Sequence, residues 1–123
     1  MTEIPSAGAR ITGEACSWPG VGAEWGSRGE WSIRLGRSEL GHLHGDHAAH
    51  FAFPNAVWDE LHAAGRITEH PVFPGKRGPA ARGIETDADV ADVIALMRLN
   101  YERIAARVAP DVLFVQDRDG PIG

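Results

Sequence analysis

The chain has 123 residues, of which 43% are hydrophobic and 24% charged, and its formal net charge is −5. This length fits one domain with one core, and the composition is that of a globular protein rather than a disordered or collagen-like chain. The acidic balance argues against nucleic acid as a partner, because binding to phosphates requires a clustered excess of Lys and Arg. Cys16 is the single cysteine, which excludes an intramolecular disulfide and a four-cysteine metal site.

The N-terminal segment 1–17 predicts a short helix that stops at Trp18-Pro19-Gly20, where proline and glycine interrupt the chain. This segment lacks the basic stretch and long apolar run of a signal peptide. No stretch of the sequence approaches the length of a membrane span. We therefore expect a cytoplasmic location and no membrane partner.

Segment 21–43 alternates in the way that is typical of β-structure. Trp31, Ile33 and Leu35 share one face, and Ser32 and Arg34 share the other. Because Gly36-Arg37 is suited to a tight turn, we expect a β-hairpin or meander.

Segment 54–64 predicts a helix. Pro54 suits the first turn, apolar residues recur at helical spacing, and Gly65 suits a cap. After it, the sequence predicts short strands at 70–73 and 81–85, which flank a Pro/Gly loop at 74–79.

The last predicted helix begins at Thr86, which stands three residues before Asp89 at the spacing of a capping box. Apolar residues then recur at spacings of three and four, and we expect the helix to end at Pro110. An edge strand is predicted at 112–115. These elements indicate the α+β class, with a small antiparallel sheet packed by two to three helices. The expected organisation is an N-terminal segment 1–17, an α+β domain 18–109 and a C-terminal tail 110–123.

Histidines are concentrated in one short stretch, and four of the six lie within 42–50. Residues two apart on a strand point to the same side about 7 Å apart, so His42 and His44 are expected to project from one face, with Leu40 beside them. Two imidazoles placed in this way are a recurrent source of nitrogen ligands for zinc, copper or iron. Asp46 or His47 could supply a third ligand.

The same groups could also act without a metal. A histidine can accept a proton from an acidic phenol or enol, and Asp46 could fix the histidine tautomer. His70, next to Pro71, could complete the site from a neighbouring strand. A third interpretation is that these histidines are polar surface residues, which is how we interpret His50 and His62. The cofactor is accordingly either none or a divalent transition metal.

The spacing His42-x-His44-x-Asp46-His47 also resembles the metal-binding motif of the metallo-β-lactamase superfamily. That fold is roughly twice as long as this chain, and it takes further ligands from downstream. Here only His62 and His70 follow. A metal-dependent hydrolase therefore remains a third hypothesis.

Most of the chain, from Trp18 to Arg103, resembles the luciferase-like domain of bacterial proteins that is related to the fungal luciferases. The stretches that carry this resemblance are Glu39-Leu40-Gly41-His42-Leu43-His44-Gly45-Asp46, Phe53-Pro54, Ala64-Gly65-Arg66, His70-Pro71-Val72 and Leu96-Met97-Arg98-Leu99-Asn100-Tyr101. The fungal enzymes have a similar Glu-x-x-His-x-His, a further histidine at the place of His47, and a His-Pro that matches His70-Pro71.

The fungal luciferases oxidise a hydroxylated pyrone with molecular oxygen. The resemblance therefore implies a pocket for a small aromatic or enol-like substrate. We take His42, His44, Asp46 and His70 as catalytic candidates, and the spacing of the histidines makes His42, His44 and His47 the metal candidates. This sequence departs from the family at 75–82, where a tryptophan-containing strand normally follows the His-Pro loop. The leading hypothesis is an oxygenase-type oxidoreductase acting on such a substrate. The alternative is a non-catalytic module that binds a small molecule or a protein.

Overall fold

A six-stranded antiparallel sheet forms the centre of the molecule, in a computed structural model that describes residues 5–119 and the side chains of residues 5–107. The strand order is β1-β2-β3-β4-β6-β5. The elements are α1 (Ala7–Cys16), β1 (Val21–Trp25), β2 (Trp31–Leu35), β3 (Ser38–His44), β4 (Ala48–Ala52), α2 (Asn55–Ala63), β5 (Thr68–Glu69), β6 (Pro79–Gly83) and α3 (Asp87–Asp119). The expected α+β class, with an antiparallel sheet and helices, is confirmed.

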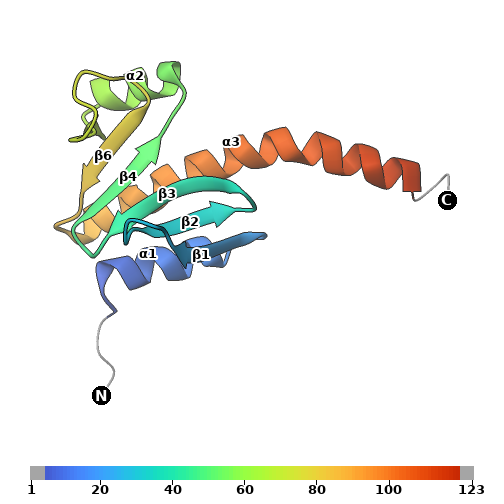
Figure 1. Cartoon of the computed structure of the whole chain (residues 1–123), viewed down its shortest axis with the longest axis horizontal. Helices are drawn as coiled ribbons and strands as arrows, with labels where there is room; N and C mark the ends of the chain where they lie inside the picture. Colours follow the sequence, from blue (N-terminus) through green and yellow to red (C-terminus); the bar gives the residue numbers. More distant parts are fainter. Residues whose placement is uncertain (1–4, 120–123) are drawn as a thin grey trace.

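The two helices α1 and α3 pack against each other and against the same side of the sheet (Figure 1). The strands turn alternate residues toward these helices, as the period of two requires. Ile33, Leu43 and Phe51 are buried there, together with Val93 and Met97 of α3. The opposite face of the sheet carries no long helix in the described part of the chain.

A β-bulge interrupts the alternation of β3. Ile33 of β2 is paired with Gly41, but the next residue, Arg34, is paired with Glu39, so Leu40 has no partner on β2. Leu40 is the extra residue of this bulge, and its side chain turns to the core side of the sheet, where it is fully buried. The expectation that Leu40 lies beside the histidines was therefore wrong, because strict alternation fails at a bulge.

The segment after α2 differs from the expected pair of strands. Residues 70–73 form a turn, closed by a hydrogen bond of 2.9 Å from the Phe73 N–H to the His70 carbonyl. Pro71 favours this conformation because its ring sets φ for the first central position of a turn. The strand that pairs with β6 is Thr68–Glu69, and β6 itself starts at Pro79, earlier than predicted.

The last helix begins as the capping box predicts. The Asp89 N–H donates to Thr86 Oγ1 and the Thr86 N–H donates to Asp89 Oδ2, each at 3.1 Å. The predicted end at Pro110 was wrong, because α3 continues to Asp119 and includes the segment 112–115 that was expected to be a strand. A proline removes one helical hydrogen bond and can bend a helix without ending it. The expected boundary at 109/110 thus falls inside α3, and residues 120–123 lie outside the described part of the chain.

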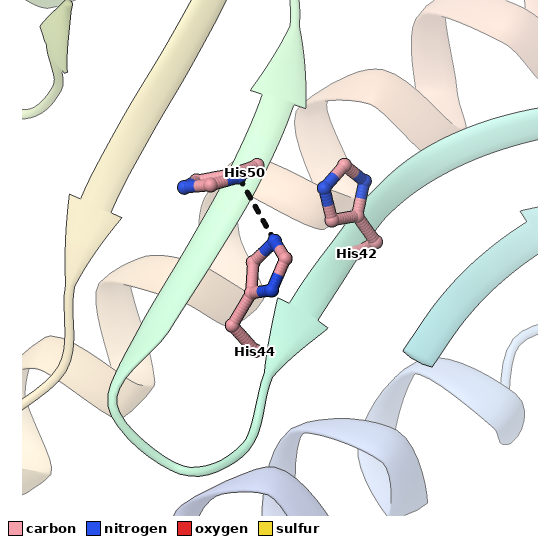
Figure 2. Close-up of side chains that lie close together, drawn as sticks. All are labelled: His42, His44 and His50. Carbon is pink, nitrogen blue, oxygen red and sulfur yellow. Dashed lines mark hydrogen bonds between the residues drawn. The ribbon is translucent and has the colours of Figure 1, made fainter. Parts of the chain in front are cut away.

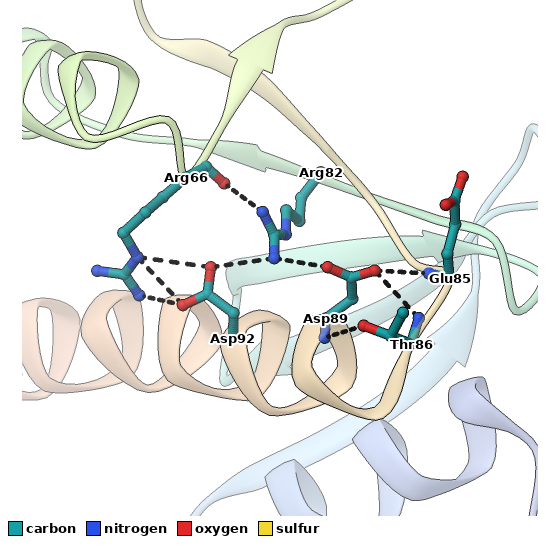
Figure 3. A network of polar contacts seen from close by, with 6 residues as sticks. All are labelled: Arg66, Arg82, Glu85, Thr86, Asp89 and Asp92. Carbon is teal, nitrogen blue, oxygen red and sulfur yellow. Dashed lines mark hydrogen bonds and ion pairs between the residues drawn. The ribbon is translucent and has the colours of Figure 1, made fainter.

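A polar network joins α3 to the rest of the fold (Figure 3). Arg82 of β6 donates to Asp89 at 2.8 Å, and Arg66 donates to Asp92 at 2.6 Å. The four side chains are half-buried, so these ion pairs are less screened than pairs at the surface. They hold β6 and the loop between α2 and β5 against the first turns of α3. Within residues 5–119, no helix has both the length and the apolar character needed to cross a bilayer.

Candidate functional site

Four histidines gather on the face of the sheet that α1 and α3 leave free. His42 and His44 project from β3, as their spacing predicts, and His50 lies opposite His42 on the neighbouring strand β4. Directly opposite residues in an antiparallel pair share one face, so this register brings the three rings together. Figure 2 shows them grouped above the two strands.

The ring contacts within this group are short. His44 Nε2 and His50 Nδ1 form a hydrogen bond of 3.1 Å, drawn as a dashed line in Figure 2. The ring centroid of His42 lies 5.1 Å from that of His44 and 5.2 Å from that of His50. Each of the three residues offers a nitrogen, and the three nitrogens lie within 4.8 Å of one another.

His70 reaches the group from the turn that follows β5. Its ring centroid lies 4.1 Å from that of His50. The Val72 N–H donates to His70 Nδ1 at 3.1 Å, so Nδ1 holds a lone pair and the neutral ring carries its proton on Nε2. His70 is therefore oriented as a hydrogen-bond donor, and the turn built on Pro71 fixes it in that role.

The carboxylate that contacts the cluster belongs to Glu39. Its Oε1 atom lies 2.5 Å from His42 Nδ1. On a regular strand Glu39 and His42 would point to opposite sides, but the bulge at Leu40 places them on the same side. Because the carboxylate accepts the proton of Nδ1, the Nε2 atom of His42 keeps a free lone pair.

A buried amide from α3 holds the bulge in place. Asn100 has no solvent exposure, and its Nδ2 atom donates to the carbonyl of Leu40 at 3.0 Å and to that of Ala52 at 3.3 Å. The bulged carbonyl would otherwise lack a partner, which is costly inside a core. The helical side of the sheet thus supports the geometry of the histidine side.

Burial makes the neutral form of His50 the stable one. Loss of hydration, followed by the like charges that His70, His44 and His42 would carry, lowers the pKa of His50 from 6.5 to about 4. Burial also lowers the pKa of His70, with smaller contributions from His42 and His44. At neutral pH, His50 and His70 are therefore uncharged imidazoles, and such rings can accept protons or bind metal ions.

A cavity of about 250 Å³ opens above the four rings. Its other walls are Arg28 and Glu30 from the β1–β2 turn, and Val72 and Phe73 from the turn after His70. A second hollow of about 210 Å³ continues from His42, His50 and His70 toward Pro79. Phe73 borders both hollows and is 43% exposed, so an aromatic ring faces this space although the expected tryptophan is missing from 75–82.

Asp46 and His47, which the sequence placed with His42 and His44, lie elsewhere. Asp46 Oδ1 accepts a hydrogen bond of 2.7 Å from the Gly8 N–H at the start of α1. His47 borders a different hollow, beside Ala7 and Arg10. Because the turn after β3 points toward α1, the residues of the His-x-His-x-Asp-His pattern do not converge on one point.

His50 and Glu39 are the site residues that reasoning from the sequence missed. His50 was interpreted as a surface residue, and only the register of β3 with β4 brings it to the centre of the group. Glu39 stands three residues before His42, at a spacing that fails on a regular strand. A usable signal for His50 was its place in a short run of apolar residues, Ala48-Ala49-His50-Phe51, which predicts a strand that could pair with the first.

The sequence profile of the Luciferase domain family matches residues 37–100, more than half of the chain. This region contains Glu39, the four clustered histidines and Asn100. No curated protein and no solved structure has significant similarity to the chain.

Proposed function

Because the chain belongs to the Luciferase domain family, we propose that it is an oxygenase-type oxidoreductase that acts on a small enol-like or phenolic substrate at the cluster of His42, His44, His50 and His70. The observation that carries this proposal is the convergence of four imidazoles from three segments on one cavity. All four lie in the region that matches the family.

In this proposal, His42 removes the acidic proton of the substrate. Its Nε2 lone pair is free, and Glu39 stabilises the imidazolium that forms. His70 donates its Nε2 proton to the oxygen on which negative charge develops. The neutral state of His50 keeps the cavity from accumulating positive charge.

The substrate anion is electron-rich and adds to molecular oxygen. A carbon–oxygen bond forms, the carbon loses two electrons, and oxygen is reduced to the level of a peroxide, which takes up one proton. The apolar wall formed by Val72 and Phe73 suits a planar substrate, because the exposed ring of Phe73 can stack on the substrate. Light emission is not part of the proposal, since it depends on the substrate.

The test is oxygen consumption by the purified protein with a panel of hydroxypyrones and catechols. We expect turnover with at least one of them, and His42→Ala should reduce kcat about 10²–10⁴-fold, the range for loss of a general base. His62→Ala serves as the matched control, since His62 lies on α2 and stacks on Trp58. Saturable binding of the same compounds without oxygen uptake would refute the oxidation and favour the alternative, a non-catalytic binding module.

A further inference from the structure

His42, His44 and His50 have the arrangement of a three-nitrogen metal site. The ligand atoms of His44 and His50 are 3.1 Å apart, and all three nitrogens lie within 4.8 Å. In a tetrahedral zinc site with bonds of about 2.0–2.1 Å, ligand nitrogens lie about 3.3 Å apart. The pair from β3 and β4 is already close to this spacing, and His42, whose ligand nitrogen lies within 4.8 Å of both, would reach it by side-chain rotation. We propose that these three histidines bind one divalent transition-metal ion with an open coordination position toward the cavity.

Glu39 supplies the support that metal-binding histidines require. Its carboxylate contacts His42 Nδ1, which fixes the tautomer that leaves Nε2 free as the ligand atom. Carboxylate–histidine–metal arrangements of this kind raise the basicity of the ligand. The contact exists only because the bulge at Leu40 turns Glu39 to the histidine side.

His70 lies beside the site but is not a ligand in this proposal. Its Nδ1 atom accepts from the Val72 N–H, so the Nε2 atom carries the proton of the neutral ring and has no lone pair for a metal. Three protein ligands remain, and a fourth position is open to water or an anion. Three ligands with an open position are the pattern of a catalytic rather than a structural zinc site.

The ligand chemistry selects the class of metal. Neutral imidazoles suit zinc, copper, iron, cobalt and nickel, whereas magnesium and calcium prefer oxygen ligands. The three ligands are neutral, so none of them offsets the double charge of the ion. The open position would therefore attract an anionic oxygen ligand, such as an enolate or a phenolate. Because His42 Nε2 cannot bind the ion and accept the substrate proton at the same time, the ion would take over from His42 the promotion of that proton's loss in the metal-bound protein.

The experiment is a titration of untagged, chelator-treated protein with Zn²⁺ in competition with a chromophoric chelator. We expect saturation at about one equivalent. Loss of an outer-shell partner costs roughly 10–100-fold in affinity, and we expect His44→Ala and His50→Ala to cost more than that. His47→Ala should bind as the wild type does, because His47 faces another hollow.

Cobalt provides a readout that does not depend on activity. Co²⁺ in a three-nitrogen site should give visible ligand-field absorption in the wild type and in His47→Ala, and a changed spectrum in His50→Gln. Far-UV circular dichroism checks that each variant is folded, and His50→Gln replaces His50→Ala if the latter does not fold. Absence of saturable zinc binding, or an equal loss of zinc affinity in His47→Ala and His50→Ala, would overturn the proposal.

Metal binding and the proposed oxidation can fail separately. Stoichiometric metal with no oxygen uptake on any substrate would sustain the metal site and refute the oxidation. Oxygen uptake that survives at full rate in metal-free protein, with no zinc binding, would refute the metal site and sustain the oxidation.

Discussion

The carboxylate of Glu39 contacts His42 Nδ1 at 2.5 Å, because the bulge between the two residues on β3 turns both side chains to the same face of the sheet. This contact sets which nitrogen of His42 faces the cavity. It couples a backbone irregularity to the chemistry of the site, because loss of the bulge would turn Glu39 away.

Glu39→Gln tests this coupling, because it keeps the shape of the side chain but removes its charge. We expect zinc affinity to fall about 10–100-fold, as for other outer-shell partners of metal-binding histidines. The chelator-competition titration measures this change. Asp46→Asn discriminates between the two candidate carboxylates. It should leave the affinity unchanged, since Asp46 bonds to the Gly8 N–H. A larger loss of zinc affinity in Asp46→Asn than in Glu39→Gln would contradict the assignment of Glu39 as the carboxylate that supports His42.

Asn100→Leu tests the support of the bulge from α3. The change leaves the buried carbonyl of Leu40 and the partly buried carbonyl of Ala52 without this donor. We expect the free energy of unfolding to fall by about 2–4 kcal/mol, measured by urea denaturation. Asn55→Ala, at an exposed position of α2, should stay within about 0.5 kcal/mol of the wild type. Equal stability of the two variants would mean that Asn100 does not hold the bulge.

Gly41→Ala tests how closely β3 approaches the core. A Cβ atom at Gly41 would lie 2.8 Å from Cδ1 of Phe51 and 3.0 Å from Cε of Met97. Overpacking of this kind costs about 1–3 kcal/mol, and a thermal or urea unfolding curve should show the loss. Gly22→Ala on β1 is the control, because nothing lies within 4 Å of its added Cβ. An undiminished stability of Gly41→Ala would show that the core can yield at this point.

The stability of the metal-free protein should depend on pH through His50. Its pKa is about 4 in the folded state and 6.5 as the ordinary value, so the unfolded chain binds a proton first as the pH falls. The contribution of His50 to the free energy of unfolding is therefore fully present above about pH 6.5, and it decreases as the pH falls from 6.5 to about 4. Because the cluster is partly open to solvent, we expect a loss of roughly 1 kcal/mol rather than the full value of the shift.

The measurement for this prediction is urea denaturation at pH 7.5, 5.5 and 4.5 in the presence of a chelator. His50→Gln should flatten the dependence relative to the wild type. Carboxylates such as Asp89, whose pKa is lowered by hydrogen bonds from the Glu85 and Thr86 N–H groups and by Arg82, contribute equally to both proteins. An identical pH profile for the two proteins would contradict the burial of a neutral His50.

Local sequence patterns alone determined much of the secondary structure of this protein. The alternation of Trp31, Ile33 and Leu35, the capping box of Thr86 and Asp89, and the apolar stripe of the last helix each depend on neighbours within a few residues, and the elements they predict are present. The same local logic placed His42 and His44 on one face, and the motifs around them indicated the family before the profile match confirmed it.

Only the tertiary structure decided which residues complete the site. The pairing of β3 with β4 brings His50 to His44, and the turn at Pro71 brings His70 to His50. The bulge at Leu40 brings Glu39 into contact with a histidine, whereas the turn after β3 carries the expected carboxylate, Asp46, toward α1. Packing between segments far apart in the chain sets the register of the strands, the bulge held by Asn100 and the course of the turn. The spacing of residues along the sequence does not predict these three features.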